Sequence, residues 1–117
     1  MDAGAALQLS PSSFADARAA LRELLDELFE MDASDLILSR GAPPTMRIDG
    51  KLLAQGDIAL TAGDIQALAL ELLLPQQWRT YEELKQVDFS FKWGSTGRIR
   101  GNMFQQRGSA AIALRAI

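Results

Sequence analysis

The chain has 117 residues, of which 48% are hydrophobic and 23% charged, and its formal net charge is −3. It contains neither cysteine nor histidine. This length is typical of one compact domain that is stable without a disulfide or a structural metal. The missing thiols and imidazoles exclude zinc fingers, haem ligation and Cys- or His-dependent catalysis, so we expect no metal site. Because the sequence shows no signal peptide and no apolar run of membrane-spanning length, we expect a cytoplasmic protein.

Charge is distributed unevenly along the chain. Residues 1–85 contain seven Lys or Arg and fourteen Asp or Glu, a balance of −7. Residues 86–117 contain five Lys or Arg and one Asp, a balance of +4. The acidic body argues against nucleic acid as a partner, because nucleic-acid-binding domains are usually positive. The basic C-terminal quarter is compatible with one local anion site.

The first predicted element is an amphipathic helix over Phe14–Glu30, in which apolar residues recur at spacings of three and four. Ser13 and Asp16 have the spacing of a capping box at its start. We expect residues 1–12 to be a flexible N-terminal tail and residues 13–117 to form a single domain. The charged outer face of this helix is expected to face solvent.

A short strand and a hairpin are predicted next, over Asp35–Ser39, Thr45–Ile48 and Lys51–Ala54. Asp49-Gly50 separates the last two and is typical of a two-residue type I′ turn.

Two helices are then predicted, the first beginning at Thr61, where Asp64 completes a capping box, and the second opening at Pro75 and running to Gln86. The aromatic residues of the second helix are expected to pack in the core rather than bind a ligand: Trp78 and Tyr81.

From Val87 onward the apolar pattern changes to alternation, which indicates strands. Turns at residues 94–97 and at Arg107-Gly108 divide this segment into three strands. Because short turns join antiparallel neighbours, we expect an α+β fold with a mostly antiparallel, twisted sheet and helices packed on one side.

The last hairpin carries the candidate site. If Arg107-Gly108 is the centre of a two-residue turn, Arg100 lies directly opposite Arg115, although like charges in that position destabilise a sheet. Arg98 and Asn102 share the same face. Converging guanidinium groups match phosphate oxygens, so these four residues form a candidate anion site.

Alternative interpretations of these arginines remain open. They can be a solvated face, or they can pair with the acidic body of the domain. A three-residue turn would reverse the parity and separate Arg100 from Arg115. The sequence has no Walker A motif and no G-x-G-x-x-G motif, so we do not expect this chain alone to be an enzyme or to hold a nucleotide.

Several segments in chain order resemble a known family: Ala33–Ser39, Gly41–Gly50, Asp88–Phe91, Arg98–Gly108 and Leu114–Ile117. They resemble the N-terminal domain of the type IV pilus retraction (twitching-motility) ATPases, in the type II/IV secretion ATPase superfamily. The resemblance implies a PAS-like domain followed by a RecA-like ATPase domain that this chain lacks. It also implies a homohexameric motor that binds ATP and Mg, contacts an inner-membrane platform protein of the pilus, and lies peripherally at that membrane.

In this superfamily two arginines from the last two strands reach the phosphates of ATP. They correspond to Arg100 and Arg115, for which the resemblance implies a catalytic role. Because Arg98 and Asn102 share their face of the predicted hairpin, we expect these two residues to lie adjacent to the nucleotide. Two positions depart from the family pattern: most retraction ATPases have histidine at Ile37 and a branched apolar residue at Gly101. A bulge at Gly101 would disturb the Arg100–Arg115 pairing.

Two other functions remain open for this fold. A PAS-like small-molecule sensor would need an internal cavity with a few polar groups. The N-terminal domain of a pilus-assembly or type II secretion ATPase would share most of the features above.

Overall fold

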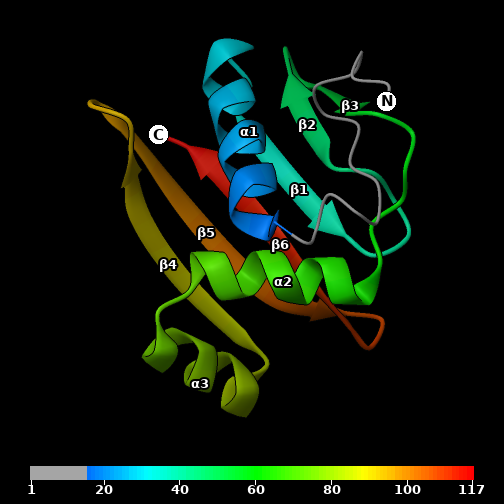
Figure 1. Cartoon of the computed structure of the whole chain (residues 1–117), viewed down its shortest axis with the longest axis vertical. Coiled ribbons are helices and arrows are strands. Elements are labelled where there is room, and N and C mark those ends of the chain that lie inside the picture. The colour runs from blue at the N-terminus through cyan, green and yellow to red at the C-terminus, as the bar shows by residue number, and fades with distance from the viewer. Residues whose placement is uncertain (1–15) are drawn as a thin grey trace.

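The structure, a computed structural model, describes residues 16–117. The predicted tail (residues 1–12) and the predicted cap residue Ser13 lie outside the described residues. Figure 1 shows the elements in chain order: α1 (Ala17–Glu30), β1 (Asp35–Ser39), β2 (Thr45–Ile48), β3 (Lys51–Ala54), α2 (Ala62–Leu72), α3 (Pro75–Leu84), β4 (Gln86–Trp93), β5 (Gly97–Gln106) and β6 (Ser109–Ala116).

The strands form one six-stranded antiparallel sheet with the order β3-β2-β1-β6-β5-β4. The helices pack on one side of it (Figure 1), which confirms the predicted α+β architecture. The first and last strands are neighbours at the centre of the sheet. Among the described residues, no helix is both long and apolar enough to cross a membrane.

Both predicted two-residue turns are confirmed by their backbone angles. Asp49 and Gly50 have φ of 51° and 79°, and Arg107 and Gly108 have φ of 54° and 79°. Positive φ at both central positions is the requirement of a type I′ hairpin. The second turn therefore determines which residues of β5 and β6 lie opposite each other.

The helix boundaries differ from the prediction at two ends. The predicted start of the first helix at Phe14 is wrong: α1 begins at Ala17, because Asp16 leaves the helical conformation and its side chain accepts a hydrogen bond from the Ala19 amide at 3.0 Å. The helix α3 ends before Gln86 because Lys85 adopts a left-handed conformation with φ of 62°. The capping box of α2 is confirmed: the Asp64 amide donates to Thr61 Oγ1 at 3.1 Å, and the Thr61 amide donates to Asp64 Oδ2 at 2.8 Å.

The interior between the sheet and the helices is filled with apolar side chains. Twelve large side chains are less than 2% exposed: Leu24, Leu25, Leu28, Leu36, Leu38, Met46, Ile65, Leu68, Ile99, Met103, Ile112 and Leu114. Trp78 and Tyr81 pack with ring centroids 5.9 Å apart, and Tyr81 is only 7% exposed, which confirms their predicted packing role.

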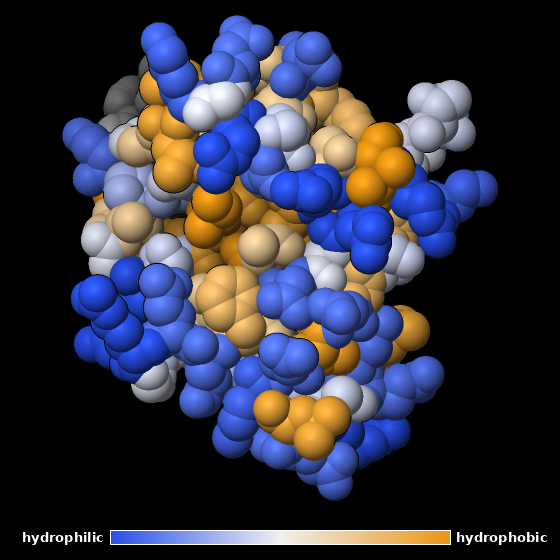
Figure 2. All heavy atoms as spheres, turned by 180° about the vertical axis from the view of Figure 1, so that it is seen from behind, coloured by the Kyte–Doolittle hydropathy of each residue, from blue (hydrophilic) through white to orange (hydrophobic). Residues whose placement is uncertain are grey.

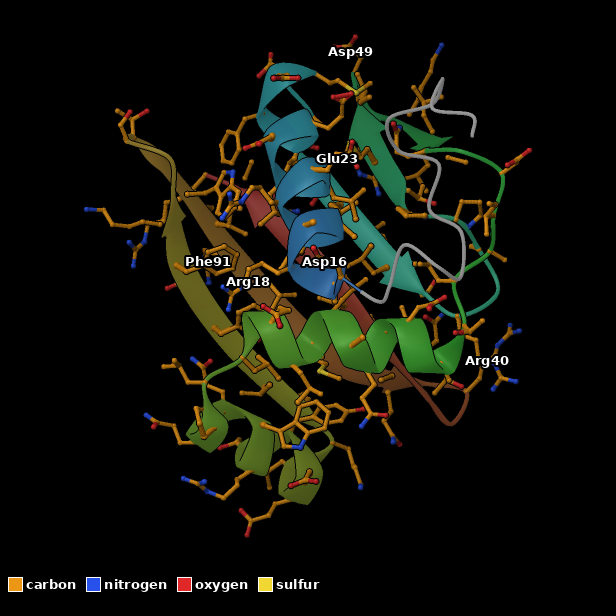
Figure 3. All side chains as sticks on the ribbon, in the orientation of Figure 1. Asp16, Arg18, Glu23, Arg40, Asp49 and Phe91 are labelled. Carbon is orange, nitrogen blue, oxygen red and sulfur yellow. The ribbon has the colours of Figure 1, made fainter. Side chains whose placement is uncertain are left out.

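Polar contacts connect α1 to its neighbours. The Arg18 guanidinium points toward α2 (Figure 3), where its Nε lies 3.2 Å from Glu71 Oε1. The indole Nε1 of Trp93 donates to Asp26 Oδ1 at 3.0 Å and joins β4 to the same helix.

Gly101 forms no bulge, so the pairing of Arg100 with Arg115 is not disturbed. Its pairing runs without interruption between Phe89 on β4 and Leu114 on β6. A Cβ atom at this position would collide with the edge of the Phe89 ring and would lie 2.9 Å from Leu114 Cδ2. The glycine therefore makes room for the Phe89 ring over the strand, which leaves the ladder regular.

We therefore expect Gly101→Ala to lower the free energy of unfolding by about 1 to 2 kcal/mol, because the Phe89 ring must be displaced. The cost should shrink in a Phe89→Leu background, which removes the ring. Urea denaturation of the four variants measures this coupling. The control is Gly63→Ala in α2, where a Cβ would meet only Thr61 Oγ1 at 3.8 Å; it should raise stability by up to about 1 kcal/mol. Equal costs of Gly101→Ala in both backgrounds would contradict this explanation.

Candidate functional site

The sheet has one face that the helices do not cover, called here the open face. Figure 2 looks onto it and shows hydrophobic residues in its middle with hydrophilic residues around them. Because successive residues of a strand alternate between faces, each strand contributes every second side chain to this surface. Ile37, at the first departure from the family pattern, lies here, half-buried and in register with Thr45 and Ala113.

A row of polar residues crosses five strands of the open face in register. Arg47 pairs with Asp35, Asp35 with Arg115, Arg115 with Arg100, and Arg100 with Ser90. Residues directly opposite each other in neighbouring strands share a face and lie close together, with Cβ atoms about 5 Å apart. The predicted juxtaposition of Arg100 and Arg115 is therefore confirmed. We call these five residues the polar row.

Asp35 is the centre of an ion-pair network in this row. Its Oδ1 lies 3.3 Å from Arg115 Nε, and its Oδ2 lies 3.4 Å from Arg47 Nε. The Ser34 hydroxyl also donates to Oδ2 at 2.6 Å. The Asp35 side chain is only 16% exposed, whereas the side chain of Arg115 is 69% exposed. The carboxylate is thus enclosed while the guanidinium of Arg115 reaches solvent.

The electrostatics of this network favour an ionised Asp35. Partial burial raises the pKa of Asp35, but the hydrogen bonds from Ser34 and Arg115 and the charges of Arg115 and Arg47 outweigh burial. The pKa of this carboxyl is therefore held below its usual value. The pairing of Arg115 with Asp35 shows that one arginine does contact the acidic body, as the alternative interpretation expected.

The other predicted site residues lie beside this network. Within residues 16–117, Arg100 is exposed and makes no ion pair or side-chain hydrogen bond. Arg98 donates from Nη2 to Ser90 Oγ at 3.4 Å. Asn102 donates from Nδ2 to Asp88 Oδ1 at 2.6 Å, so its amide already has a partner. Arg100 and Arg115 are consequently the guanidinium groups best placed to bind an anion.

A surface hollow of about 310 Å³ brings most of these residues together. Its lining includes Arg100, Arg115 and Asn102, together with the carboxylates of Asp35 and Asp88. Arg98 does not line it. Because the two carboxylates repel an anion, a phosphate fits best at the exposed tips of the two arginines. Among the described residues, no group of three or more acidic side chains is arranged to hold a metal ion.

Sequence reasoning missed Asp35 and Arg47 as members of the site. Asp35 stands at the start of an apolar strand inside one of the segments that carried the family resemblance. No local pattern links it to Arg115, because the two residues meet only through the β1–β6 pairing.

The pKa of Asp35 predicts how stability depends on pH. In the unfolded chain the ordinary value is about 3.8, and the folded value is lower, so the ionised carboxylate stabilises the fold above pH 3.8. This contribution is lost as the pH falls below 3.8 through the folded value. Asp35→Asn should cost about 1 kcal/mol at neutral pH, and its difference from wild type should vanish in acid.

Urea denaturation between about pH 7 and pH 2 measures this difference. Asp57→Asn, at an exposed position without an ion pair in the described part of the chain, is the control and should change stability by less than about 0.5 kcal/mol. A constant difference between wild type and Asp35→Asn at every pH would show that Asp35 acts by packing and not by charge.

Comparison with known proteins identifies the relatives of this fold. No family model matches the chain. It is 34% identical over 97 residues to the "Type IV pilus retractation ATPase PilT" of Pseudomonas aeruginosa, covering 83% of this chain and 28% of that protein. It is 28% identical over 95 residues to the "Type IV pilus ATPase PilU" of the same organism, covering 81% of this chain and 25% of that protein.

A solved structure gives the same result. The crystal structure of the pilus retraction motor PilT with bound ADP superposes with a TM-score of 0.73 at 41% identity, covering 80% of this chain and 28% of that one. The chain thus spans 25 to 28% of the length of the curated relatives. In sequence and fold, this chain is a homologue of PilT and PilU and fits the N-terminal domain of those proteins.

Proposed function

We propose that this chain is the N-terminal domain of a hexameric ATPase that powers type IV pilus retraction, and that Arg100 and Arg115 reach the phosphates of ATP. The similarity of this chain to PilT in sequence and fold supports its assignment to a pilus ATPase. The observation that carries the role of the arginines is their direct cross-strand pairing at the exposed hollow of the open face.

Two guanidinium groups directly opposite each other in a ladder destabilise the sheet. Asp35 lies beside Arg115 and compensates only one of them within the described residues. An incoming phosphate relieves the remaining repulsion and accepts paired hydrogen bonds from the planar guanidinium forks. The sequence carries no Walker A motif, so ATP and its Mg would be held by a RecA-like domain of the same or a neighbouring subunit.

In that arrangement the arginines act as catalytic residues. Positive charge placed against a phosphoryl group undergoing transfer stabilises the charge of the transition state, an effect worth about 10³ to 10⁵ in rate where it has been measured. Because both side chains project from the open face, this face would form part of a subunit interface. As part of the same proposal, the motor contacts the inner-membrane platform protein of the pilus and lies at the cytoplasmic side of that membrane.

The sensor alternative receives no support from the described residues. It requires an internal cavity, and the space between the sheet and the helices is filled by fully buried side chains. The second ATPase alternative is a pilus-assembly or type II secretion motor. Such a motor would use the same arginines, but its ATP hydrolysis would drive pilus assembly or secretion and not pilus retraction.

The role of the arginines is tested in the full-length ATPase. Arg100→Ala and Arg115→Ala should each lower kcat for ATP hydrolysis by about 100-fold or more, with hexamer content unchanged, because each removes charge from the transition state. Arg100→Lys and Arg115→Lys should remain well below wild type, since an ammonium group lacks the planar fork.

The matched control is Arg79→Ala, an exposed arginine on helix α3 that is not part of the polar row. It should keep wild-type turnover. Wild-type turnover in both Arg100→Ala and Arg115→Ala would reduce the role of this face to assembly or contact.

The direction of the motor is tested in the host bacterium. Deleting the gene should leave cells with abundant surface pili and no twitching, because pili still extend but no longer retract. Electron microscopy of pili and a surface motility assay measure both properties. Loss of the pili themselves would identify an assembly motor instead.

A further inference from the structure

We propose that Asp35 is a positioning residue that holds the Arg115 guanidinium in the orientation needed to bind phosphate. This inference rests on the function proposed above, since it assigns a role within the same site. The juxtaposition that suggests it is the ion pair between a nearly enclosed carboxylate and a largely exposed guanidinium on neighbouring strands.

The atoms in contact matter for this role. Asp35 Oδ1 approaches Nε of Arg115, at 3.3 Å, and not the terminal nitrogens. A guanidinium carries five N–H donors, four of them on Nη1 and Nη2. The contact therefore fixes the plane of the group from its side while the Nη1–Nη2 edge, which binds phosphate in a bidentate manner, remains available.

Asp35 is itself firmly held. Ser34 Oγ and Arg47 Nε both contact its Oδ2, at 2.6 Å and 3.4 Å. The backbone beside it is also anchored on both sides: the Ser34 amide donates to the Arg47 carbonyl at 2.9 Å, and the Ala116 amide donates to the Ser34 carbonyl at 3.0 Å. A fixed carboxylate on a central strand can hold a long, exposed side chain in one orientation.

The two arginines of the site are therefore not equivalent. Arg115 is oriented before the nucleotide arrives, whereas Arg100 has no comparable side-chain partner within residues 16–117. Orientation has an electrostatic cost, because the negative charge of Asp35 opposes that of ATP. Removing this charge should thus impair the reaction without weakening the binding of ATP.

The test is a double-mutant cycle in the full-length hexameric ATPase with Asp35→Asn, Arg115→Ala and the double variant. We expect Asp35→Asn to lower kcat by about tenfold or more while KM for ATP stays the same or falls. In the Arg115→Ala background it should have no further effect on kcat. A purely structural role would lower kcat in both backgrounds by the same factor.

Two further variants distinguish a local effect on the site from a general loss of folding. Ser34→Ala removes one contact to Asp35 without changing any charge, and it should lower kcat by a smaller factor in the same direction. Glu71→Gln breaks another Arg–carboxylate contact through Nε, with Arg18 at 3.2 Å in the helical layer, and should keep kcat within about twofold of wild type. Hexamer content and thermal stability are measured for every variant.

The outcomes separate this inference from the proposed function. If Arg115→Ala lowers kcat but Asp35→Asn does not, or if their effects multiply, the positioning role is wrong and the function of Arg115 stands. If Arg115→Ala leaves kcat unchanged, the proposed catalytic role of Arg115 fails, and the positioning role of Asp35 fails with it.

Discussion

The pairing of β1 with β6 is the constraint on which the rest of the structure depends. β1 to β3 form one antiparallel unit and β4 to β6 form another, and each unit is held together by short connections. Only the β1–β6 ladder, from Asp35↔Arg115 to Ser39↔Ala111, joins them into a single sheet. Both strands also contact α2, so the same ladder creates the surface that this helix covers.

The register of this ladder determines both faces of the protein. Leu36 pairs with Leu114 under the helices, and both side chains are buried. One residue earlier on β1, Asp35 pairs with Arg115 on the open face. Because side chains alternate with a period of two, a slip by one residue would bring the carboxylate of Asp35 into the apolar core. The free-energy cost of burying that charge therefore stabilises the one register that places both the core residues and the candidate site correctly.

The parts of the fold that depend on neighbouring residues could be predicted from the sequence. Asp49-Gly50 and Arg107-Gly108 provide the positive φ values that their turns require, and the second turn alone places Arg100 opposite Arg115. The β1–β6 pairing could not be predicted, because no turn connects these strands and the register depends on packing across the whole domain. Asp35 was therefore missed. The start of α1 was misplaced because Ser13 and Asp16 can both act as N-caps and sequence spacing does not rank them.

The order of the strands in the sheet also affects how the protein folds during synthesis. The ribosome makes β6 last of the six strands, yet β6 lies between β1 and β5 in the sheet. Until β6 emerges, β1 and β5 each have an unpaired edge that carries side chains destined for the core, such as Leu36 and Ile99. Such edges pair readily with other chains. During synthesis the domain therefore passes through a stage in which the edges of β1 and β5 are unpaired and prone to aggregation. This stage ends only when β6 inserts between them.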